Sequence, residues 1–477
     1  MRVIIVGGGV AGSEAGTYLG QRAGRPLEII EIECEPSRRF GGWGFQRFPV
    51  RETTNLATRK MYLGADPDEI FRWTRDPEAR ARWPAEVQDA PLHPDRPLPR
   101  CLMQEYVRWR RSQVDNPRVR FRSITGEAMR VQLEGDARVS VTLKTGARLE
   151  GERLIMASGS IAVKIPDYLQ PLREHPRVII DPLTAEGDAR RGALRPGARV
   201  LILGTGLTGE EQANVLLRRG HTALTILSRH GYRHYAYPRE QHNAPLELDE
   251  PPSFLAAETP EEFNQSLGEF YGRYLDAGHS PEDILAAVRP FWDELRAELG
   301  GCYKAAERLH RFRRSLAVNS IGAPATVAEN VRDAEARGDV QVVRGTVERV
   351  TDRGDVFVVQ LRERDASAPR ELEFDHIINA VGRTIIRHPI WDQLLADGLA
   401  RKHAGIGIRV SELGQMIDAR GGASDRVWVV GMARAGDHAL RHGYLGNTAF
   451  NVPQVRSHLY KTIDAMLERM DAGPAPA

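Results

Sequence analysis

Two glycine-rich motifs occur at separate places in the chain, each after a short apolar segment typical of a β-strand (residues 3–6 and 200–203). Their glycines are Gly7, Gly9 and Gly12 in the first motif and Gly204, Gly206 and Gly209 in the second. A strand that turns sharply at such glycines into a helix directs backbone N–H groups at a pyrophosphate. The spacing therefore predicts two dinucleotide-binding turns, although glycines also end helices and form ordinary turns.

The residue that follows the next predicted strand differs between the two motifs. In the first half, Glu31 follows a strand predicted at residues 27–30, and a carboxylate accepts a hydrogen bond from a free ribose hydroxyl. After the second motif, a strand predicted at residues 224–227 is followed by Ser228 and Arg229, whose hydroxyl and guanidinium suit a 2′-phosphate. We therefore expect FAD at the first turn and NADPH at the second. The alternative for Arg229 is a solvated surface charge.

The cysteines limit the route that electrons can take from the flavin. Cys34, Cys101 and Cys302 are the three cysteines, and no two of them form a C-x-x-C pair. Neither a disulfide framework nor a redox-active dithiol is indicated, which argues against flavoproteins that pass electrons through a dithiol. The electrons would then go to oxygen, to another small acceptor or to a partner protein. If oxygen is the acceptor, a flavin C4a-hydroperoxide must be shielded from water.

Length and composition exclude several classes of protein. The 477 residues suffice for two or three domains, and the net charge of +2 gives no sign of a nucleic-acid partner. No segment contains the roughly 18 consecutive apolar residues that indicate a membrane-spanning helix. We expect a cytoplasmic protein with no membrane partner. The sequence leaves its oligomeric state open, a homo-oligomer included.

The two halves look like loose repeats of one plan. Each motif is followed by a predicted pair of strands, at residues 129–133 with 139–143 and at residues 340–343 with 356–361. An apolar strand that runs into a glycine comes after each pair. The pattern predicts an α/β fold with two Rossmann-like dinucleotide-binding domains.

The same repetition suggests where the domains begin and end. A last strand at residues 427–430, followed by Gly431, would close a flavin domain. The FAD-binding domain is therefore expected to be discontinuous, with residues 1–165 and 375–477. The NADPH-binding domain, residues 166–374, would be inserted between these two pieces.

A helical insert is expected within the NADPH-binding domain, at about residues 251–331. Thr259 and Ser280 each precede a proline and acidic residues, which is typical of a helix start. Six aromatic residues are expected to pack the helices together, with a role in a substrate pocket as the alternative: Phe263, Phe270, Tyr271, Tyr274, Phe291 and Trp292.

Two segments are candidates for the surroundings of the flavin. In the first, Gly42 permits close approach of the backbone and Trp43 can stack on a ring, although a glycine turn with a packed loop is the alternative. The second should begin the final helix, whose N–H groups would face the flavin O2. Polar side chains of both segments are the candidate catalytic residues: Gln46, Arg47, Asn55 and Asn447.

Histidines do not indicate a metal site. His438 and His442 stand four residues apart, but no third ligand has a suitable spacing, so a solvated helix face is expected instead. A run of basic residues after Arg229 could bind the NADPH phosphate or form a solvated loop. It comprises His230, Arg233, His234, Arg239 and His242.

Nearly the whole chain resembles a bacterial family of FAD/NAD(P)-binding proteins. Residues 55–73, NLATRKMYLGADPDEIFRW, are similar to the family pattern LNVPA…M…DDP…FLRWL. Further matches are Pro99, Arg100, Tyr106, His175 with Pro176, Asp181 with Pro182, and residues 204–208 and 447–456. The family includes an FAD-dependent urate hydroxylase and is related to the class B flavin monooxygenases, which include N-hydroxylating and Baeyer-Villiger enzymes. The turn at residues 41–43 looks like the flavin turn of that class.

Departures from the family pattern lie near the expected cofactor sites. The Baeyer-Villiger pattern of Phe-x-Gly followed by His and Trp is absent before Gly204. Gly209, Glu210 and Glu211 stand where the family has methionine, valine and aspartate. Residues 44–47 read GFQR where the family has GVAY. Substrate and oxygen reactivity are therefore expected to differ from those of the named members.

These observations and the resemblance together predict an FAD- and NADPH-dependent oxidoreductase. We expect a monooxygenase that uses molecular oxygen to hydroxylate a small polar metabolite at nitrogen or carbon. One alternative is an NADPH-dependent flavoprotein reductase that passes electrons to a quinone or a protein acceptor. The other is a non-catalytic, redox-responsive binding protein that uses the helical insert as its interaction surface.

Overall fold

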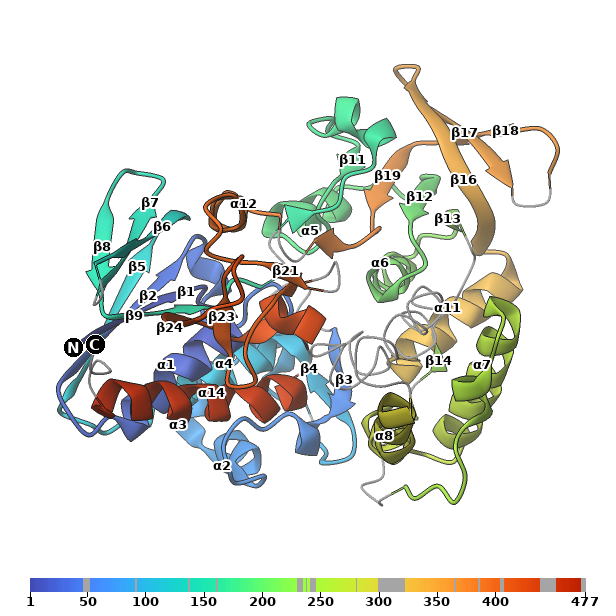
Figure 1. Cartoon of the computed structure of the whole chain (residues 1–477). Helices are drawn as coiled ribbons and strands as arrows, with labels where there is room; N and C mark the ends of the chain where they lie inside the picture. The colour runs from blue at the N-terminus through green and yellow to red at the C-terminus, as the bar shows by residue number, and fades with distance from the viewer. Residues whose placement is uncertain are drawn as a thin grey trace. The chain divides into compact units, whose positions relative to one another are not determined.

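The computed structural model divides the chain into two compact units (Figure 1). Unit 1 contains the described residues of Met1–Ala162 and of 384–477, and unit 2 those of Val163–Arg383. The structure describes residues 1–45, 52–90, 92–135, 138–159, 162–229, 235–236, 238–240, 246–279, 281–298, 322–363, 366–384, 387–403, 407–437 and 452–472. Within these ranges, no helix is both long enough and apolar enough to cross a membrane.

Unit 1 is built on a six-stranded sheet in the order β23-β24-β9-β1-β2-β5. The strands are β1 (Arg2–Val6), β2 (Leu27–Glu33), β5 (Val119–Thr125), β9 (Arg153–Met156), β23 (Gln415–Ile417) and β24 (Ala423–Val429). All neighbours pair in parallel except β23, which runs antiparallel to β24. The apolar runs of β1 and β9 are buried on both faces, as a covered parallel sheet requires.

Helices and a small sheet cover the two faces of this sheet. On one face, α1 (Val10–Arg22) and α14 (Val452–Ala472) pack their apolar residues against the sheet. The other face carries α12 (Pro389–Ala396) and an antiparallel sheet. That small sheet consists of β6 (Ala128–Glu134), β7 (Arg138–Leu143) and β8 (Arg148–Gly151). The pairing of β6 with β7 confirms the first predicted strand pair.

A third apolar cluster of unit 1 holds the segment between β2 and β5. Its helices are α2 (Glu69–Arg75), α3 (Pro77–Arg80) and α4 (Arg100–Ser112), and its strands β3 (Thr53–Ala57) and β4 (Pro97–Pro99) pair antiparallel. The fully buried Trp73 packs against Trp83 and Tyr106 at its centre. α4 also packs on α1, so this cluster is fixed to the first glycine turn.

Unit 2 is built on a seven-stranded sheet in the order β11-β19-β12-β13-β16-β17-β18. The strands are β11 (Val178–Ile179), β12 (Val200–Leu203), β13 (Leu224–Ser228), β16 (Val340–Asp352), β17 (Phe357–Glu363), β18 (Arg370–Phe374) and β19 (His376–Asn379). The start of β16 pairs in parallel with β13, and its remainder pairs antiparallel with β17. The prediction that residues 340–343 pair with residues 356–361 is therefore wrong, because one long strand serves two partners.

One helix of unit 2, α11 (Ala325–Arg337), overlaps the end of the predicted insert. The helices are α5 (Ala185–Gly192), α6 (Leu207–Arg218), α7 (Pro260–Asp276), α8 (Pro281–Glu298) and α11. α11 packs on α6 and β16, as the connecting helix of a doubly wound sheet does. The expected insert boundary at residue 331 would cut this helix. β14 (Tyr235–Ala236) pairs with β15 (Gly322–Ala323) and brings together the segments before α7 and after α8.

Both predicted helices of the insert are found, and the aromatic residues of α7 pack with one another and with Phe254. Thr259 and Glu262 form a capping box at the start of α7, and α8 begins at Pro281. Phe263 and Tyr271 are buried, and Phe270 makes edge contacts with Phe254 and Tyr274.

The expected domain boundary at residue 375 needs correction. Because β19 pairs in parallel with β12 and β11, it belongs to the sheet of unit 2. The chain returns to unit 1 at β20 (Arg383–Thr384), which pairs with β10 (Ala162–Val163) where the chain first leaves it.

Candidate nucleotide-binding sites

The first glycine turn has a geometry that only glycine can adopt. Gly7 has φ of +105°, and a Cβ on it would lie 2.6 Å from the carbonyl oxygen of Ala157. A Cβ on Gly12 would lie 1.8 Å from the carbonyl oxygen of Gly7. The Gly7 N–H donates to Ile32 at 2.9 Å, which ties the turn to the end of β2. α1 therefore begins against the backbone of β1 and points its free N–H groups into the turn.

The acid at this turn is Glu33 rather than Glu31. β2 extends to Glu33, three residues beyond the predicted end of the strand. Glu33 Oε2 accepts a hydrogen bond from the N–H of Gly8 at 2.9 Å, and its Oε1 accepts one from the N–H of Glu35 at 3.2 Å. These bonds hold its carboxylate beside the turn, in the position from which the acid of such a fold binds a ribose.

Glu31 instead takes part in a buried ion pair. The guanidinium of Arg111 binds both carboxylate oxygens of Glu31, one of them at 3.0 Å. Arg111 also donates to the carbonyl of Ser13 at 2.6 Å and to the hydroxyl of Thr17 at 3.0 Å, both on α1. Since Glu31 is 6% exposed and its oxygens are already paired, a role in ribose binding is not supported.

The neighbouring residue on α4 forms a second buried ion pair. Arg110 binds both oxygens of Glu14 on α1, at 2.9 and 2.7 Å, and also pairs with Glu69. Tyr460 on α14 donates to Glu14 at 2.8 Å. Burial acts to lower the pKa of Arg110, but Glu14 outweighs it and holds that pKa above its ordinary value. α1, α2, α4 and α14 are thereby joined around the helix that starts at the first turn.

A glycine-rich loop covers the first turn. Phe40, the one described non-glycine residue with positive φ (70°), donates its N–H to the carbonyl of Gly8 at 2.7 Å. Gly42 has φ of +61°, and its Cα lies 3.1 Å from the place of a Cβ on Gly9. The guanidinium of Arg38 lies 3.2 Å from the ring centre of Trp43. The predicted close approach at Gly42 is thus made by the protein backbone, while Trp43 packs on Arg38.

Two further segments of unit 1 meet at the first turn. Gly431, predicted to follow the closing strand, has φ of +72°, and a Cβ on it would lie 2.9 Å from that of Ala11 on α1. Its N–H donates to His458 Nε2 at 3.1 Å. Ser158 follows β9 beside Gly7 and accepts a hydrogen bond from the indole N–H of the fully buried Trp391 at 3.0 Å.

The second glycine turn repeats the geometry of the first. Gly204 has φ of +108°, and a Cβ on it would lie 2.6 Å from the carbonyl oxygen of Ala380. A Cβ on Gly209 would lie 2.0 Å from the carbonyl oxygen of Gly204, whereas one on Gly206 would meet nothing within 4 Å. The Gly204 N–H donates to the carbonyl of Leu227 at 2.7 Å. The backbone of this turn therefore suits a pyrophosphate equally well.

Hydroxyl groups occupy the strand end at the second turn. β13 ends at Ser228, one residue beyond its predicted end, and the hydroxyl of Thr205 donates to Ser228 Oγ at 3.0 Å. Arg229 follows directly. Burial raises the pKa of Tyr168, and the nearby guanidinium of Arg229 partly offsets that shift. Ser228 and Arg229 thus lie where the sequence placed them, next to two hydroxyl residues that it did not single out.

The acids that depart from the family pattern lie inside unit 2. Glu210 and Glu211 in the first turns of α6 are 2% and 3% exposed. Further along α6, Asn214 accepts a hydrogen bond from Asn330 on α11 at 2.8 Å. Gln212 accepts one from the buried Arg191 of α5, which pairs with Asp188. α6 is therefore held by polar contacts with both of its neighbouring helices.

Only some of the remaining predicted residues lie within the described ranges. Asn55 lies half-buried on β3. Of the basic run, Arg239 is exposed and pairs with Glu329 on α11. Several predicted residues lie outside the described ranges: Gln46, Arg47, Asn447, His438, His442, His230, Arg233, His234 and His242. Among the described residues, no group of three histidines, cysteines or acids could hold a metal ion.

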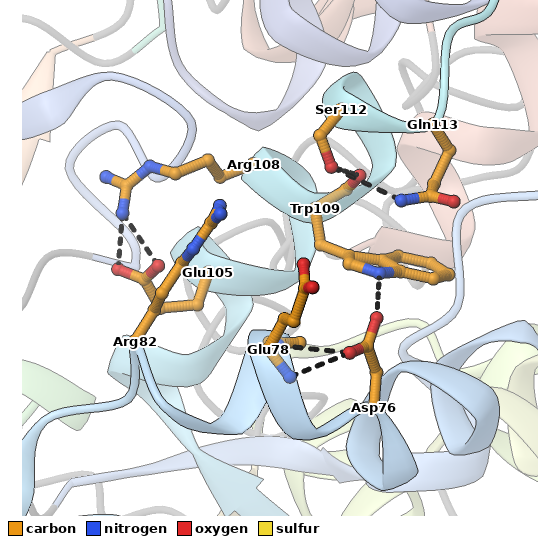
Figure 2. Close-up of a pocket in the computed structure, with 9 residues that line it drawn as sticks. Asp76, Glu78, Arg82, Glu105, Arg108, Trp109, Ser112 and Gln113 are labelled. Atoms are coloured by element: carbon orange, nitrogen blue, oxygen red, sulfur yellow. Dashed lines mark hydrogen bonds and ion pairs between the residues drawn. The ribbon is translucent and has the colours of Figure 1, made fainter.

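A surface hollow of about 50 Å³ lies between α3 and α4 in unit 1 (Figure 2). Its polar groups pair with one another: Trp109 donates to Asp76 at 2.9 Å, and Arg108 binds Glu105. Asp76 also caps α3 through the N–H groups of Glu78 and Ala79. These bonds fix α3 on α4, and none of the lining residues belongs to a glycine turn.

Comparison with known proteins supports the interpretation of the first turn. Residues 4–161 match the model of a family described as FAD-NAD(P)-binding. This match covers unit 1 from β1 to the end of its first piece and includes Glu33. No curated protein sequence matches the chain significantly.

Solved structures share the fold over nearly the whole chain. The ornithine N-hydroxylase of Kutzneria sp. 744 has a TM-score of 0.63 at 14% identity, covering 98% of this chain and 99% of that one. The ornithine hydroxylase of Pseudomonas aeruginosa has a TM-score of 0.59 at 16% identity, covering 98% of both chains. The L-lysine 6-monooxygenase of Pseudomonas syringae has a TM-score of 0.59 at 15% identity, covering 98% and 99%. At these identities the likeness establishes the predicted α/β fold with two Rossmann-like units.

Proposed function

We propose that this chain is an FAD- and NADPH-dependent monooxygenase that hydroxylates a small polar metabolite at nitrogen or carbon. The proposal is carried by two matching glycine turns whose adjoining strands end differently, one in Glu33 and the other in Ser228 followed by Arg229. Two nucleotide turns in one chain suit hydride transfer from a nicotinamide to a flavin. The scattered cysteines offer no dithiol as the next electron acceptor.

The residues of unit 1 fit FAD. The first turn leaves no room for a Cβ at Gly7 or Gly12, so backbone N–H groups and the start of α1 are open to the diphosphate. The carboxylate of Glu33 would accept hydrogen bonds from the ribose, since Gly8 and Glu35 fix its orientation. Gly431, beside Ala11, lets the closing strand approach the same place.

The residues of unit 2 fit NADPH. The second turn would hold the diphosphate in the same way, and Ser228 and Arg229 would bind the 2′-phosphate through a hydroxyl and a guanidinium. When bound, the two cofactors supply hydride transfer and oxygen activation. The protein contributes binding, orientation and exclusion of water. Gln46, Arg47, Asn55 and Asn447 remain our candidates for the wall of the substrate site.

The shared fold favours an amine as substrate. The solved structures with the same two-unit architecture include an ornithine hydroxylase, an ornithine N-hydroxylase and an L-lysine 6-monooxygenase, whose named substrates are amino acids with a side-chain amine. The resemblance to a family with a urate hydroxylase adds a purine to the compounds worth testing. We therefore propose small diamines, basic amino acids and urate as first candidates.

The test uses the purified full-length protein. Flavin released by heat is identified by mass spectrometry, and NADPH and NADH are compared for bleaching of the flavin absorbance without oxygen. In air, NADPH with each candidate substrate should yield a product heavier by one oxygen atom. The proposal is wrong if the protein retains no flavin. It is also wrong if NADPH oxidation requires an added quinone and no oxygenated product forms, which would indicate the reductase instead.

A further inference from the structure

We propose that Thr205 is a specificity-determining residue of the second turn, which together with Ser228 makes unit 2 select a 2′-phosphorylated nicotinamide nucleotide over one with a free ribose. The assignment rests on the proposed function of unit 2 and names a residue beyond Ser228 and Arg229. Thr205 stands between Gly204 and Gly206, is 8% exposed and donates to Ser228 Oγ at 3.0 Å.

The hydrogen bonds of the two turns establish which residues correspond. Gly7 donates to the carbonyl of Ile32, and Gly204 donates in the same way to that of Leu227. The next residue on each strand is therefore equivalent, which pairs Glu33 with Ser228. The residue after the first glycine is equivalent as well, which pairs Gly8 with Thr205.

Sterics couple these two positions. A Cβ on Gly8 would lie 3.0 Å from the Cβ of Glu33 and 3.4 Å from its Cγ and Oε2. A side chain at position 8 would therefore crowd the acid of the first turn, whereas glycine leaves it room. In the second turn the arrangement is reversed, since Thr205 carries a branched side chain and Ser228 is short. A β-branched residue at position 205 thus leaves less room for a glutamate at position 228 than a glycine would.

The chemistry of the pairs differs in the same direction. Gly8 donates to a carboxylate, which is an acceptor for ribose hydroxyls and repels a phosphate. Thr205 donates to a hydroxyl, and such a donated bond strengthens the bond that the second hydroxyl makes in turn. A hydroxyl pair beside Arg229 suits the acceptor oxygens of a phosphate. We infer that Thr205 contributes both by disfavouring an acid at position 228 and by orienting Ser228.

The experiment measures dissociation constants of NADP⁺ and NAD⁺ by calorimetry on the full-length protein, without turnover. Thr205→Val keeps the shape and removes the donor, so we expect NADP⁺ to bind about tenfold more weakly, the equivalent of about 1.4 kcal/mol. Binding of NAD⁺ should change less than about twofold. Thr205→Ser restores the hydroxyl and should restore the NADP⁺ affinity. Thr225→Val, which removes a buried hydroxyl within β13, is the matched control and should leave both constants unchanged.

A pair of charge-introducing variants tests the steric coupling. Ser228→Glu alone should weaken both nucleotides, because Thr205 crowds the new side chain. The double variant Thr205→Gly with Ser228→Glu rebuilds the arrangement of the first turn and should prefer NAD⁺. An unchanged NADP⁺ to NAD⁺ ratio in Thr205→Val, or a double variant that still prefers NADP⁺, would overturn the assignment of Thr205. If the unaltered protein binds neither nucleotide, the proposed function itself fails.

Discussion

The two glycine turns use the same backbone hydrogen bonds but differ in the side chains beside them. In unit 1 the carboxylate of Glu33 accepts a hydrogen bond from the N–H of Gly8. In unit 2 the hydroxyls of Thr205 and Ser228 form a hydrogen bond with each other. Glycine is sterically required at the same two positions of each turn. In our proposal, the backbone of the turn determines where a dinucleotide binds, while the side chains at position 8 or 205 and at the end of the neighbouring strand determine which dinucleotide it is.

The correspondence extends to the opposite ends of the strands. The N–H of Arg2 donates to the carboxylate of Glu152 at 2.5 Å, and the N–H of Arg199 donates to that of Asp375 at 2.8 Å. In return, Glu152 and Asp375 each donate their N–H to the carbonyl of the same arginine, at 2.9 Å in both units. One acid per unit therefore connects the strand of the glycine turn to the strand beside it.

The largest expected effect separates the two acids of β2. Glu31→Gln leaves the buried Arg111 without its charge partner and should lower the free energy of unfolding by about 3–5 kcal/mol. FAD affinity of the folded protein should stay within about threefold. Glu33→Gln should cost little stability but weaken FAD by about 10- to 100-fold, because a charged acceptor of ribose hydrogen bonds is lost.

Denaturant unfolding and FAD titration of the deflavinated protein measure the two quantities separately. If Glu31→Gln were the variant that releases FAD, the assignment of the ribose acid to Glu33 would be wrong.

The second prediction tests whether the turns need all of their glycines. Gly209→Ala places a Cβ against the carbonyl oxygen of Gly204 and should cost about 3 kcal/mol or abolish nucleotide binding, since the contact is with backbone. Gly206→Ala meets nothing within 4 Å and should change the free energy of unfolding by less than about 1 kcal/mol. Thermal unfolding and NADP⁺ binding of the two variants provide the measurement, and equal losses would contradict the geometry.

The third prediction concerns the acids at the opposite strand ends. Burial acts to raise the pKa of Asp375, but hydrogen bonds from Arg199 outweigh it and hold that pKa below its ordinary value of 3.8. Its contribution to stability is therefore present above the ordinary pKa and lost as the pH falls through the lowered one. Asp375→Asn should cost about 1.5 kcal/mol at pH 7 and flatten the loss of stability between about pH 5 and pH 3. Urea unfolding at a series of pH values checks this, and a variant with an undiminished acid dependence would refute it.

The smallest effect distinguishes two buried tryptophans of unit 1. Trp391 donates to Ser158 beside the first turn, whereas Trp428 donates to the carbonyl of Asp425 elsewhere on β24. Replacement of either by phenylalanine leaves a similar cavity, so both variants should lose comparable stability. FAD affinity should fall about threefold to tenfold in Trp391→Phe alone, which corresponds to one lost hydrogen bond. An equal loss of FAD in Trp428→Phe would indicate a general packing defect.

Much of the fold followed from patterns that are local in the sequence. The glycine turns, the strands beside them, the pair β6 and β7, and the capping box of α7 all depend on residues close together in the chain. The expected insert ends at about residue 331 and so takes in only the first part of α11. Its contacts with α6 and β16 are tertiary and have no local signal.

The acid proposed to bind the FAD ribose shows more sharply what a local sequence pattern fails to predict. The segment at residues 27–33 reads LEIIEIE, so acids are interspersed among apolar residues and either of the last two could end the strand. The choice between Glu31 and Glu33 depends on Arg111, which approaches from α4 and neutralises Glu31. Thr205 was missed for a related reason, because its importance appears only when the equivalent Gly8 is compared with it in space.

The adjacent arginines of α4 constrain the order in which unit 1 can form. Arg110 and Arg111 pair with Glu14 and Glu31, which precede them by 96 and 80 residues. Burial of either acid without its partner would cost several kcal/mol. We therefore expect β1, α1 and β2 to complete their packing only after α4 has been synthesised. Their final packing would then depend on a helix that lies much later in the chain.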